Sequence, residues 1–364
     1  MSSSGISKRL VPIAAAALAL VLAVAGCGGS DGGGGPKIAL LLPENETPRY
    51  ESADRPYFEE KVEESCPDCE VLYSNAGGDA SKQQSQAEAA LTQGAEVLVL
   101  DPMDAKSAAA MVEKAKAQNV PVLSYDRLIE NAEVDWYVSF DNEKVGELQA
   151  ETLAKKLKED GSASGPIVMI NGDPADSNAA LFKAGAHKGF DAAGVEVAKE
   201  YDTPEWSAEN AQNEMQQAIT ALGKGGFTGV YAANDDTGGG AIAAMKSAGV
   251  NPAEVPVTGQ DATVAGVQRI LAGQQYMTVY KAIKPEAEIS AEIAIALAEG
   301  KKPKGEVTDQ LDNGKAKVPS TLLEPVAVTK DNVKDTVIED EFISPGELCT
   351  GPYAAACKEA GISG

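Results

Sequence analysis

Short apolar runs, often β-branched, alternate with longer amphipathic runs along most of this chain. The strand-like runs recur at 37–43, 70–74, 96–101, 120–126, 166–172, 195–201, 229–235 and 255–261. Helical patterns lie between them, at 56–65, 80–93, 105–118, 143–159, 178–193, 208–222, 238–248 and 263–272. Near-continuous apolar strands joined through helices are typical of parallel strands covered on both faces. The alternation therefore predicts an α/β protein built on doubly wound parallel sheets.

The number of these units predicts two sheets rather than one. A body of about 310 residues exceeds what one hydrophobic core usually serves, and polar insertions interrupt the pattern near residues 140 and 281. We therefore expect two lobes joined by crossover strands. The predicted limits are 37–140 plus 282–322 for the N-terminal lobe, 141–281 plus 323–345 for the C-terminal lobe, and 346–364 for a cysteine-containing tail.

The first 26 residues have the pattern of an export signal. Lys8 and Arg9 precede an apolar stretch from Leu10 to Ala25 that ends in small residues before Cys27. "LAVAGC" has the form of a lipobox, which predicts cleavage before Cys27 and a lipid on its thiol; an ordinary signal with an incidental cysteine is the alternative. The glycine-rich residues that follow, within 27–36, predict a flexible tether. We expect an extracytoplasmic protein held at the cell membrane by this lipid.

The charge of the chain argues against nucleic-acid binding. The formal net charge is -24, and removal of the signal takes away two cations and no anions, which gives -26. Phosphate backbones are bound through Lys and Arg. A chain this acidic would repel them.

Four cysteines remain beyond Cys27, at Cys66, Cys69, Cys349 and Cys357. Outside the cytoplasm a disulfide is the default state, and four cysteines allow three pairings. We favour Cys66 with Cys69 and Cys349 with Cys357 over long-range pairing. A redox CxxC and a four-thiolate zinc site stay open as alternatives, although a redox CxxC normally opens a helix after a strand, whereas this one follows a helical pattern and precedes a strand.

Polar and charged side chains follow the strand-like runs where these end. In an open parallel sheet, ligands bind beyond the carboxyl ends of the strands. Asp and Asn are also the preferred helix N-caps, which is the alternative for each of them. A cation at a helix N-terminus opposes the helix dipole, so capping does not explain the two arginines. The residues are Arg49, Asp101, Asp104, Asp126, Arg127, Asp173, Asp176, Asn178, Asn234, Asp235, Asp236 and Asp261.

This set of side chains suits a ligand with adjacent hydroxyl groups. Carboxylates, amides and guanidinium groups supply the acceptors, mixed pairs and forked donors that such hydroxyls need. The C–H faces of a sugar also pack on aromatic rings, and Tyr50, Tyr125, Trp136 and Trp206 fall at or near strand ends. Trp206, in the loop "DTPEWSAEN", is hard to explain as core, although packing on the following helix is an alternative. Trp136 fits a core position better.

Catalytic and metal-binding patterns are weak in this chain. His187 is the only histidine and lies in a helical stretch, so Ser/His/Asp catalysis and histidine-based metal sites lack their residues. No GxGxxG or GxxxxGK[ST] loop is present. A carboxylate pair for glycoside hydrolysis is conceivable, but abundant acids make that signal unspecific. We expect no enzyme, no cofactor and no metal.

Seven segments are similar to the sugar-binding proteins of ABC importers, most closely those of the D-xylose-binding type. These segments are "VLSYDRLI", "YVSFDNEKVGELQAE", "NAALFKAG", "AANDDTGGGAIAAM", "TGQDA", "MTVYKAI" and "KDTVI". The resemblance runs in order from Lys37 to about Ser344. It implies the type I periplasmic-binding-protein fold, in which two lobes close on a monosaccharide and present it to a membrane permease. The CxxC and the tail have no counterpart in it.

The resemblance also implies sugar contacts at particular positions. It assigns Trp206 as a stacking ring, and it implies that Asp126 and Arg127 neutralise each other while both point at ring hydroxyls. With Tyr50, which adjoins Arg49, the predicted ligand-binding residues are Arg49, Tyr50, Asp126, Arg127, Asp176, Asn178, Trp206, Asn234, Asp261 and Lys281.

Taken together, we expect a monomeric, lipid-anchored receptor that delivers D-xylose or a similar aldopentose to an ABC permease. A receptor of the same fold that passes a sugar or furanosyl signal to a membrane sensor is the second hypothesis, and a carbohydrate-cleaving enzyme is the third. A sugar-responsive repressor shares the fold, but no helix-turn-helix precedes Lys37 and the chain is predicted to be exported.

Overall fold

A computed structural model of the chain describes residues 34–362. The predicted signal and the predicted lipidation site at Cys27 lie outside the described residues. Residues 34–362 belong to one compact unit.

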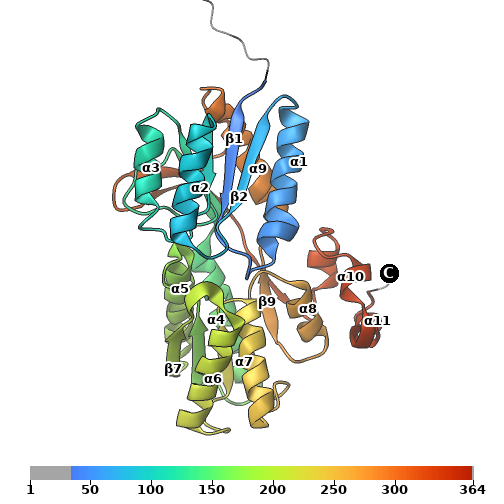
Figure 1. Cartoon of the computed structure of the whole chain (residues 1–364). Coiled ribbons are helices and arrows are strands. Elements are labelled where there is room, and N and C mark those ends of the chain that lie inside the picture. Colours follow the sequence, from blue (N-terminus) through green and yellow to red (C-terminus); the bar gives the residue numbers. More distant parts are fainter. Residues whose placement is uncertain (1–33, 363–364) are drawn as a thin grey trace, which may run out of the picture. The chain divides into compact units, whose positions relative to one another are not determined.

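A seven-stranded sheet forms the first half of this unit. Its order is β10-β11-β5-β4-β3-β1-β2, and all neighbours are parallel except β10 and β11. Helices cover both faces, with α2 and α3 on one and α1 and α9 on the other (Figure 1). This is the doubly wound arrangement predicted from the alternating pattern. The strands are β1 Lys37–Leu42, β2 Glu70–Asn75, β3 Val97–Leu100, β4 Val122–Tyr125, β5 Trp136–Phe140, β10 Asp309–Asp312 and β11 Lys317–Leu323; the helices are α1 Arg55–Ser65, α2 Ala80–Thr92, α3 Ala109–Lys116 and α9 Ile283–Ala298.

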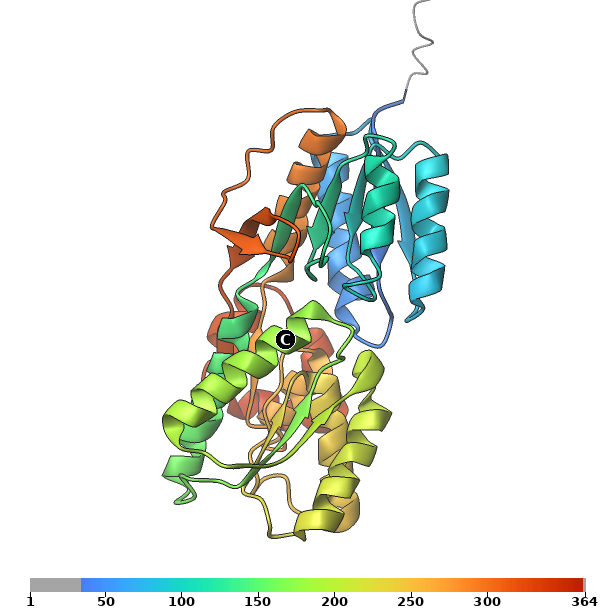
Figure 2. The same ribbon diagram turned by 90° about the vertical axis from the view of Figure 1, so that its left-hand side faces the viewer.

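Two smaller sheets form the second half. One has the parallel order β7-β6-β8, and the other pairs β9 with β12 antiparallel. Helices α4 and α5 pack on one side of the three-stranded sheet and α6 and α7 on the other (Figure 2). The strands are β6 Ile167–Asn171, β7 Val197–Asp202, β8 Gly229–Ala232, β9 Met277–Tyr280 and β12 Val326–Thr329; the helices are α4 Asn142–Glu159, α5 Ser177–Ala193, α6 Ala208–Leu222, α7 Asp235–Ala248 and α8 Val264–Leu271.

The chain passes between the two groups of strands three times, from β5 to α4, from β9 to α9 and from β11 to β12. We keep the predicted limits of the lobes as a proposal, and call the elements of the seven-stranded sheet the N-terminal lobe and those of the smaller sheets the C-terminal lobe.

The strands predicted from the sequence differ from the observed strands at several places. Residues 255–261 do not form a strand: only Val257 makes a bridge, to Val230, because Asp261 and Ala262 adopt left-handed backbone conformations that end the extended run. Strands β5, β9 and β10–β12 and helix α9 were not predicted as such. Strands β9, β10 and β12 have four residues each, too few for their alternation to stand out. Strand β11, with seven residues, and α9 were missed despite their length.

Helices α4 and α5 pack in close contact, and this contact places one wall of the candidate functional site. An added Cβ on Gly146 would lie 1.9 Å from the Phe182 carbonyl oxygen, and one on Gly185 would lie 1.9 Å from that of Glu143. Only glycine permits this approach. The crossing fixes α5, and with it Asn178 and Phe182.

The tail lies beside α8, where Leu348, Cys357 and Ile362 are buried against Ile270 and Leu271 (Figure 1). The tail follows η3 Lys334–Ile338 and begins within α10 Pro345–Leu348; it also contains η4 Gly351–Tyr353 and α11 Ala354–Glu359. Disulfides join Cys349 with Cys357 and, at the end of α1, Cys66 with Cys69. These are the two pairs that the sequence favours.

Candidate functional site

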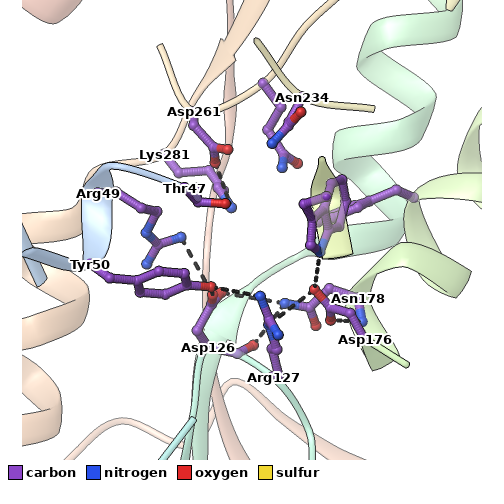
Figure 3. A pocket seen from close by; sticks show the side chains of 13 residues that line it. Thr47, Arg49, Tyr50, Asp126, Arg127, Asp176, Asn178, Asn234, Asp261 and Lys281 are labelled. Atoms are coloured by element: carbon purple, nitrogen blue, oxygen red, sulfur yellow. Dashed lines mark hydrogen bonds and ion pairs between the residues drawn. The ribbon is translucent and has the colours of Figure 1, made fainter. Parts of the chain in front are cut away.

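A cavity lies among the strand ends and helix starts of both lobes (Figure 3). Its empty volume, including space that opens to solvent, is about 280 Å³, so any ligand that it holds in this conformation is small. The structure brings all ten predicted ligand-binding residues to its wall. Its lining consists of Thr47, Arg49, Tyr50, Asp126, Arg127, Asp176, Asn178, Phe182, Trp206, Asn234, Gln260, Asp261 and Lys281.

A kinked backbone explains why Asp126 and Arg127 both face the cavity. Successive side chains of a strand point to opposite faces, but Asp126 follows β4 with a φ of +53°, a conformation that Asp tolerates better than most residues. Its N–H donates to the Val138 carbonyl at 2.9 Å, and its own carbonyl accepts from Tyr137 Oη, Ser139 Oγ and Asn178 Nδ2. The turn is therefore fixed from several sides.

Arg127 is paired with carboxylates other than its neighbour. It is 2% exposed, and its guanidinium group lies 3.0 Å from Asp176, 3.5 Å from Asp101 and 3.7 Å from Glu44. No ion pair joins it to Asp126 among residues 34–362. The expectation that Asp126 and Arg127 neutralise each other is therefore wrong, because the kink turns the two side chains toward different partners.

Arg49 supplies the cation for Asp126. Its Nη1 lies 3.5 Å from Asp126 Oδ2, while its other nitrogens donate to Asp54 and, at 2.8 Å, to Glu286 on α9. Although burial acts to raise the pKa of Asp126, Arg49, Lys281 and Arg127 together hold it below its ordinary value. Asp126 therefore faces the cavity as a carboxylate.

Further acids lie beneath the two arginines. Neither carboxylate oxygen of Asp101 accepts a hydrogen bond, and burial raises the pKa of Asp101 well above its usual value despite Arg127. Burial likewise raises the pKa of Glu286 well above its usual value, against the effect of Arg49. Both pKa shifts favour the neutral form of the carboxyl group, at Asp101 and at Glu286. The lining itself carries three cations and three carboxylates, namely Arg49, Arg127 and Lys281 with Asp126, Asp176 and Asp261.

The C-terminal lobe contributes a second kinked turn, at Asp261. Its φ is +85°, and its N–H donates to the Val279 carbonyl at 2.9 Å. Lys281 lies 3.1 Å from the Asp261 carboxylate and is 4% exposed, with its ammonium 5.6 Å and 5.7 Å from the ring centroids of Phe140 and Phe182. Asp261 is thus held for contact with a ligand.

The N-cap alternative is also correct for two lining residues. Asp176 accepts from the Asn178 N–H at the start of α5, and Asn234 accepts from the Thr237 N–H in a capping box at the start of α7. Because a cap leaves part of the side chain free, both residues cap a helix and line the cavity.

Trp206 forms a wall of the cavity. It is 5% exposed, its Nε1 donates to Asp176 Oδ2 at 3.1 Å, and its ring lies edge-on to Phe182 with centroids 6.3 Å apart. An added Cβ on Gly172 would lie 2.0 Å from the indole, so the ring needs glycine at that position.

The remaining candidates have structural positions. Trp136 is buried in the core and donates to Thr321 Oγ1, and Tyr125 Oη donates to Asp54 rather than into the cavity. His187 lies at the surface, 3.2 Å from Glu200. Asp101, Asp104, Asp173, Asp235 and Asp236 do not line the cavity.

Three lining residues were missed, namely Thr47, Phe182 and Gln260. Phe182 lies four residues after Asn178 in α5, so helical periodicity could have placed it on the same face. Gln260 directly precedes Asp261, but alternation along an extended chain predicts that it faces away. Thr47 lies in a loop without a periodic pattern.

The described part of the chain contains neither a candidate metal centre nor a helix that could span a membrane. Between residues 34 and 362, no three His, Cys, Asp or Glu side chains are grouped to hold a metal ion. Within the same range, no helix combines the length and apolarity needed to cross a bilayer.

A model of the periplasmic binding protein domain matches residues 38–302. The chain belongs to the periplasmic binding protein family. This confirms the family and the type I fold that the motifs resemble, and members of this family are binding proteins rather than enzymes.

Individual relatives cover most of the chain. The D-xylose-binding periplasmic protein of Escherichia coli is 40% identical over 316 residues, which is 86% of this chain and 92% of that one. The multiple sugar-binding periplasmic receptor ChvE of Rhizobium radiobacter is 34% identical over 286 residues, 74% of this chain and 81% of that one. A solved ABC transporter solute binding protein from Clostridium phytofermentans, with bound β-D-glucose, is 30% identical with a TM-score of 0.77 and covers 86% of this chain and 99% of its own.

Proposed function

We propose that this protein captures a monosaccharide, with D-xylose as the first candidate, in the cavity between its two lobes and delivers it to an ABC permease. The observation that carries the proposal is the lining: three buried cations and three buried carboxylates, with amides and an indole, around a small cavity. Equal numbers of opposite charges favour a neutral ligand. Their donors and acceptors match a ligand rich in hydroxyl groups.

Burial makes these contacts strong enough for tight binding. A hydrogen bond to a charged group contributes about 1.5–3 kcal/mol when both partners are kept, and Arg49, Asp126, Arg127 and Asp261 are each no more than 5% exposed. Ion pairs of Arg49 with Asp126, of Arg127 with Asp176 and of Asp261 with Lys281 hold these side chains in place before the ligand arrives, which lowers the entropy cost of binding. The face of Trp206 would pack on the C–H groups of the sugar.

Membrane attachment is part of the proposal. The lipobox at residues 22–27 supports a lipid on Cys27, and the tether that follows would keep the binding unit near its permease. We propose that the protein acts there as a monomer, because the cavity is completed within one chain.

The sugar is tested by thermal unfolding of the purified protein with xylose, ribose, arabinose, glucose, galactose and fructose. A ligand that binds only the folded state raises the melting temperature by an amount set by its concentration over Kd. We expect the largest rise with D-xylose. A larger rise with another sugar would keep the class and change the ligand, whereas no rise with any sugar would contradict the proposal.

A receptor that reports to a membrane sensor is the second candidate, favoured by the 34% identity to a multiple sugar-binding receptor. Uptake of labelled sugar by cells that lack this protein separates the two. Lost uptake supports delivery to a permease. Normal uptake with a lost transcriptional response to the sugar supports the sensor.

A further inference from the structure

Gln260 is a lining residue whose side-chain amide has no partner among residues 34–362. It is 2% exposed, yet its Oε1 accepts no hydrogen bond, and no donation from its Nε2 occurs within residues 34–362. Buried amides are nearly always paired, because leaving one unpaired costs free energy comparable to a lost hydrogen bond. An unpaired amide at a cavity wall therefore needs an explanation.

Other unbonded atoms of the lining have ion-pair partners. Arg49 Nη1 lies 3.5 Å from Asp126, Arg127 Nε lies 3.0 Å from Asp176, and Asp261 Oδ1 lies 3.1 Å from Lys281. Gln260 Oε1 differs from these three in having neither a hydrogen bond nor an ion pair in the described part of the chain. We therefore expect the hydrogen-bond partner of Gln260 Oε1 to lie in the cavity.

The backbone around Gln260 is built to hold the amide there. Its carbonyl accepts from the Asp235 N–H at 3.0 Å, and Asp235 Oδ2 accepts from both the N–H and the hydroxyl of Thr263. An added Cβ on Gly259 would lie 2.2 Å from Asp235 Oδ1, so glycine is required beside Gln260. The left-handed conformation of Asp261 then turns both Gln260 and Asp261 toward the same cavity.

The amide offers what the charged lining residues lack. Carboxylates only accept hydrogen bonds, and guanidinium and ammonium groups only donate them, whereas an amide does both from one side chain. The neighbouring Asn178 amide is already engaged by Tyr137 and Asp126. A hydroxyl also donates and accepts, so the Gln260 amide matches either one hydroxyl or two adjacent hydroxyls of a neutral ligand.

We infer that Gln260 is a specificity-determining residue that binds a hydroxyl group of the sugar. This inference rests on the proposed function and adds a contact that the family resemblance did not assign. Its consequence is selection by hydroxyl pattern: a sugar without the hydroxyl that meets Gln260 would leave the amide unpaired and bind more weakly.

The test compares Gln260→Met with the wild-type protein by calorimetric titration, using whichever sugar of the panel binds the wild type most tightly. Met keeps the length of the side chain and removes both polar atoms. We expect a tenfold or greater loss of affinity. Gln217→Met, at an exposed position of α6, is the matched control and should bind as the wild type does.

Melting without sugar separates ligand binding from a structural role. Because the amide has no partner in the described part of the chain, Gln260→Met should melt at the same temperature as the wild type or higher. A lower melting temperature without sugar, or affinity within threefold of wild type, would overturn the inference and leave the proposed function standing.

Deoxy sugars identify the contact. With D-xylose as the ligand, the 2-, 3- and 4-deoxy forms are titrated into both proteins. One of them should bind wild type and Gln260→Met equally, because the pair that the mutation removes is already missing. If the removal of each hydroxyl lowered the affinity by the same factor in the wild type and in Gln260→Met, the inference would fail. If the wild type bound no sugar at all, the inference and the proposed function would fall together.

Discussion

The same kinked turn is built once in each lobe, and the two copies differ in what surrounds them. After β4, Asp126 adopts a φ of +53° and donates to Val138 in β5; before α8, Asp261 adopts a φ of +85° and donates to Val279 in β9. In both cases the strand that accepts this bond leads directly into a crossover between lobes. Each lobe thus places one carboxylate at the cavity by the same backbone device.

The surroundings of the two turns are unlike. The Asp126 turn carries Arg127, which stands among the buried acids Asp176, Asp101 and Glu44. The Asp261 turn carries the unpaired amide of Gln260 and one ion pair, with Lys281. The first turn is therefore part of the charge balance of the folded protein, whereas the second mainly offers groups to a ligand. Substitutions should therefore affect folding at the first turn and binding at the second.

Arg127→Met is expected to have the largest effect, on both stability and binding. It leaves Asp176, whose carboxylate lies 3.0 Å from the guanidinium group, buried without its cation, and removing one partner of a buried pair costs about 3–5 kcal/mol. The free energy of unfolding, measured by urea denaturation, should fall by that amount, and sugar binding should be lost.

Arg55→Met is the matched control for this substitution. Arg55 pairs with Glu59 within α1, and its side chain is 38% exposed, so its loss should cost no more than about 1 kcal/mol. Equal unfolding curves for Arg127→Met and Arg55→Met would contradict the proposal that the Asp126 turn stabilises the fold more than the Asp261 turn does.

Lys281→Met is expected to weaken binding more than stability. Asp261 loses its ion-pair partner but still borders the cavity, where water can reach it. Asp126 loses the more distant influence of Lys281 but keeps Arg49. We expect a tenfold to hundredfold rise in Kd for the sugar and a smaller loss of unfolding free energy than for Arg127→Met. Lys284→Met, at a position 57% exposed, should change neither quantity. A larger stability loss for Lys281→Met than for Arg127→Met would reverse the comparison.

The smallest expected effect concerns Asp236, beside the second turn at the start of α7. Burial, followed by the nearby acids Asp235 and Asp261, raises its pKa to about 7, with Glu44 adding to this and Arg269 opposing it. From about pH 4 to pH 7 the folded state holds a proton that the unfolded state has lost, so the free energy of unfolding falls as pH rises through this window.

Asp236→Asn removes this contribution. Melting temperatures measured from pH 5 to pH 8.5 should decline less steeply for the variant, which should melt a few degrees above the wild type at pH 8. At the first turn the pKa of Asp126 is lowered, so its contribution is present throughout this range and is lost only as pH falls through acidic values. Parallel curves of melting temperature against pH for the wild type and Asp236→Asn would show that the pKa of Asp236 is not raised.

Position along the chain made much of the site predictable. Parallel strands bring their carboxyl ends to one edge of a sheet, so Asp176 and Asn234 could be expected near one another from their places after β6 and β8, and Asp126 at the corresponding edge of the other sheet, after β4. The motifs added Trp206 and Lys281 by resemblance. The type of fold followed from the alternation of strands and helices, which reflects local hydrophobic periodicity.

Partners far apart in sequence could not be predicted in the same way. Arg49 and Glu286 are 237 residues apart and pair only because α9 returns to the first sheet. The adjacent Asp126 and Arg127 suggested a pair, but the left-handed backbone at Asp126 separates their partners. Gln260 showed the opposite failure, because alternation places it away from the cavity and the conformation of Asp261 brings it in.

The sequence by itself determined the fold class, the family and the positions at which polar residues follow the strands, because these depend on local periodicity and on short motifs. Only the tertiary structure decided which charge meets which and which amide is left without a partner. Those outcomes depend on two backbone kinks, at Asp126 and Asp261, and on the packing of distant elements against them. A side chain's sequence neighbours do not determine its spatial neighbours once the backbone leaves the extended conformation.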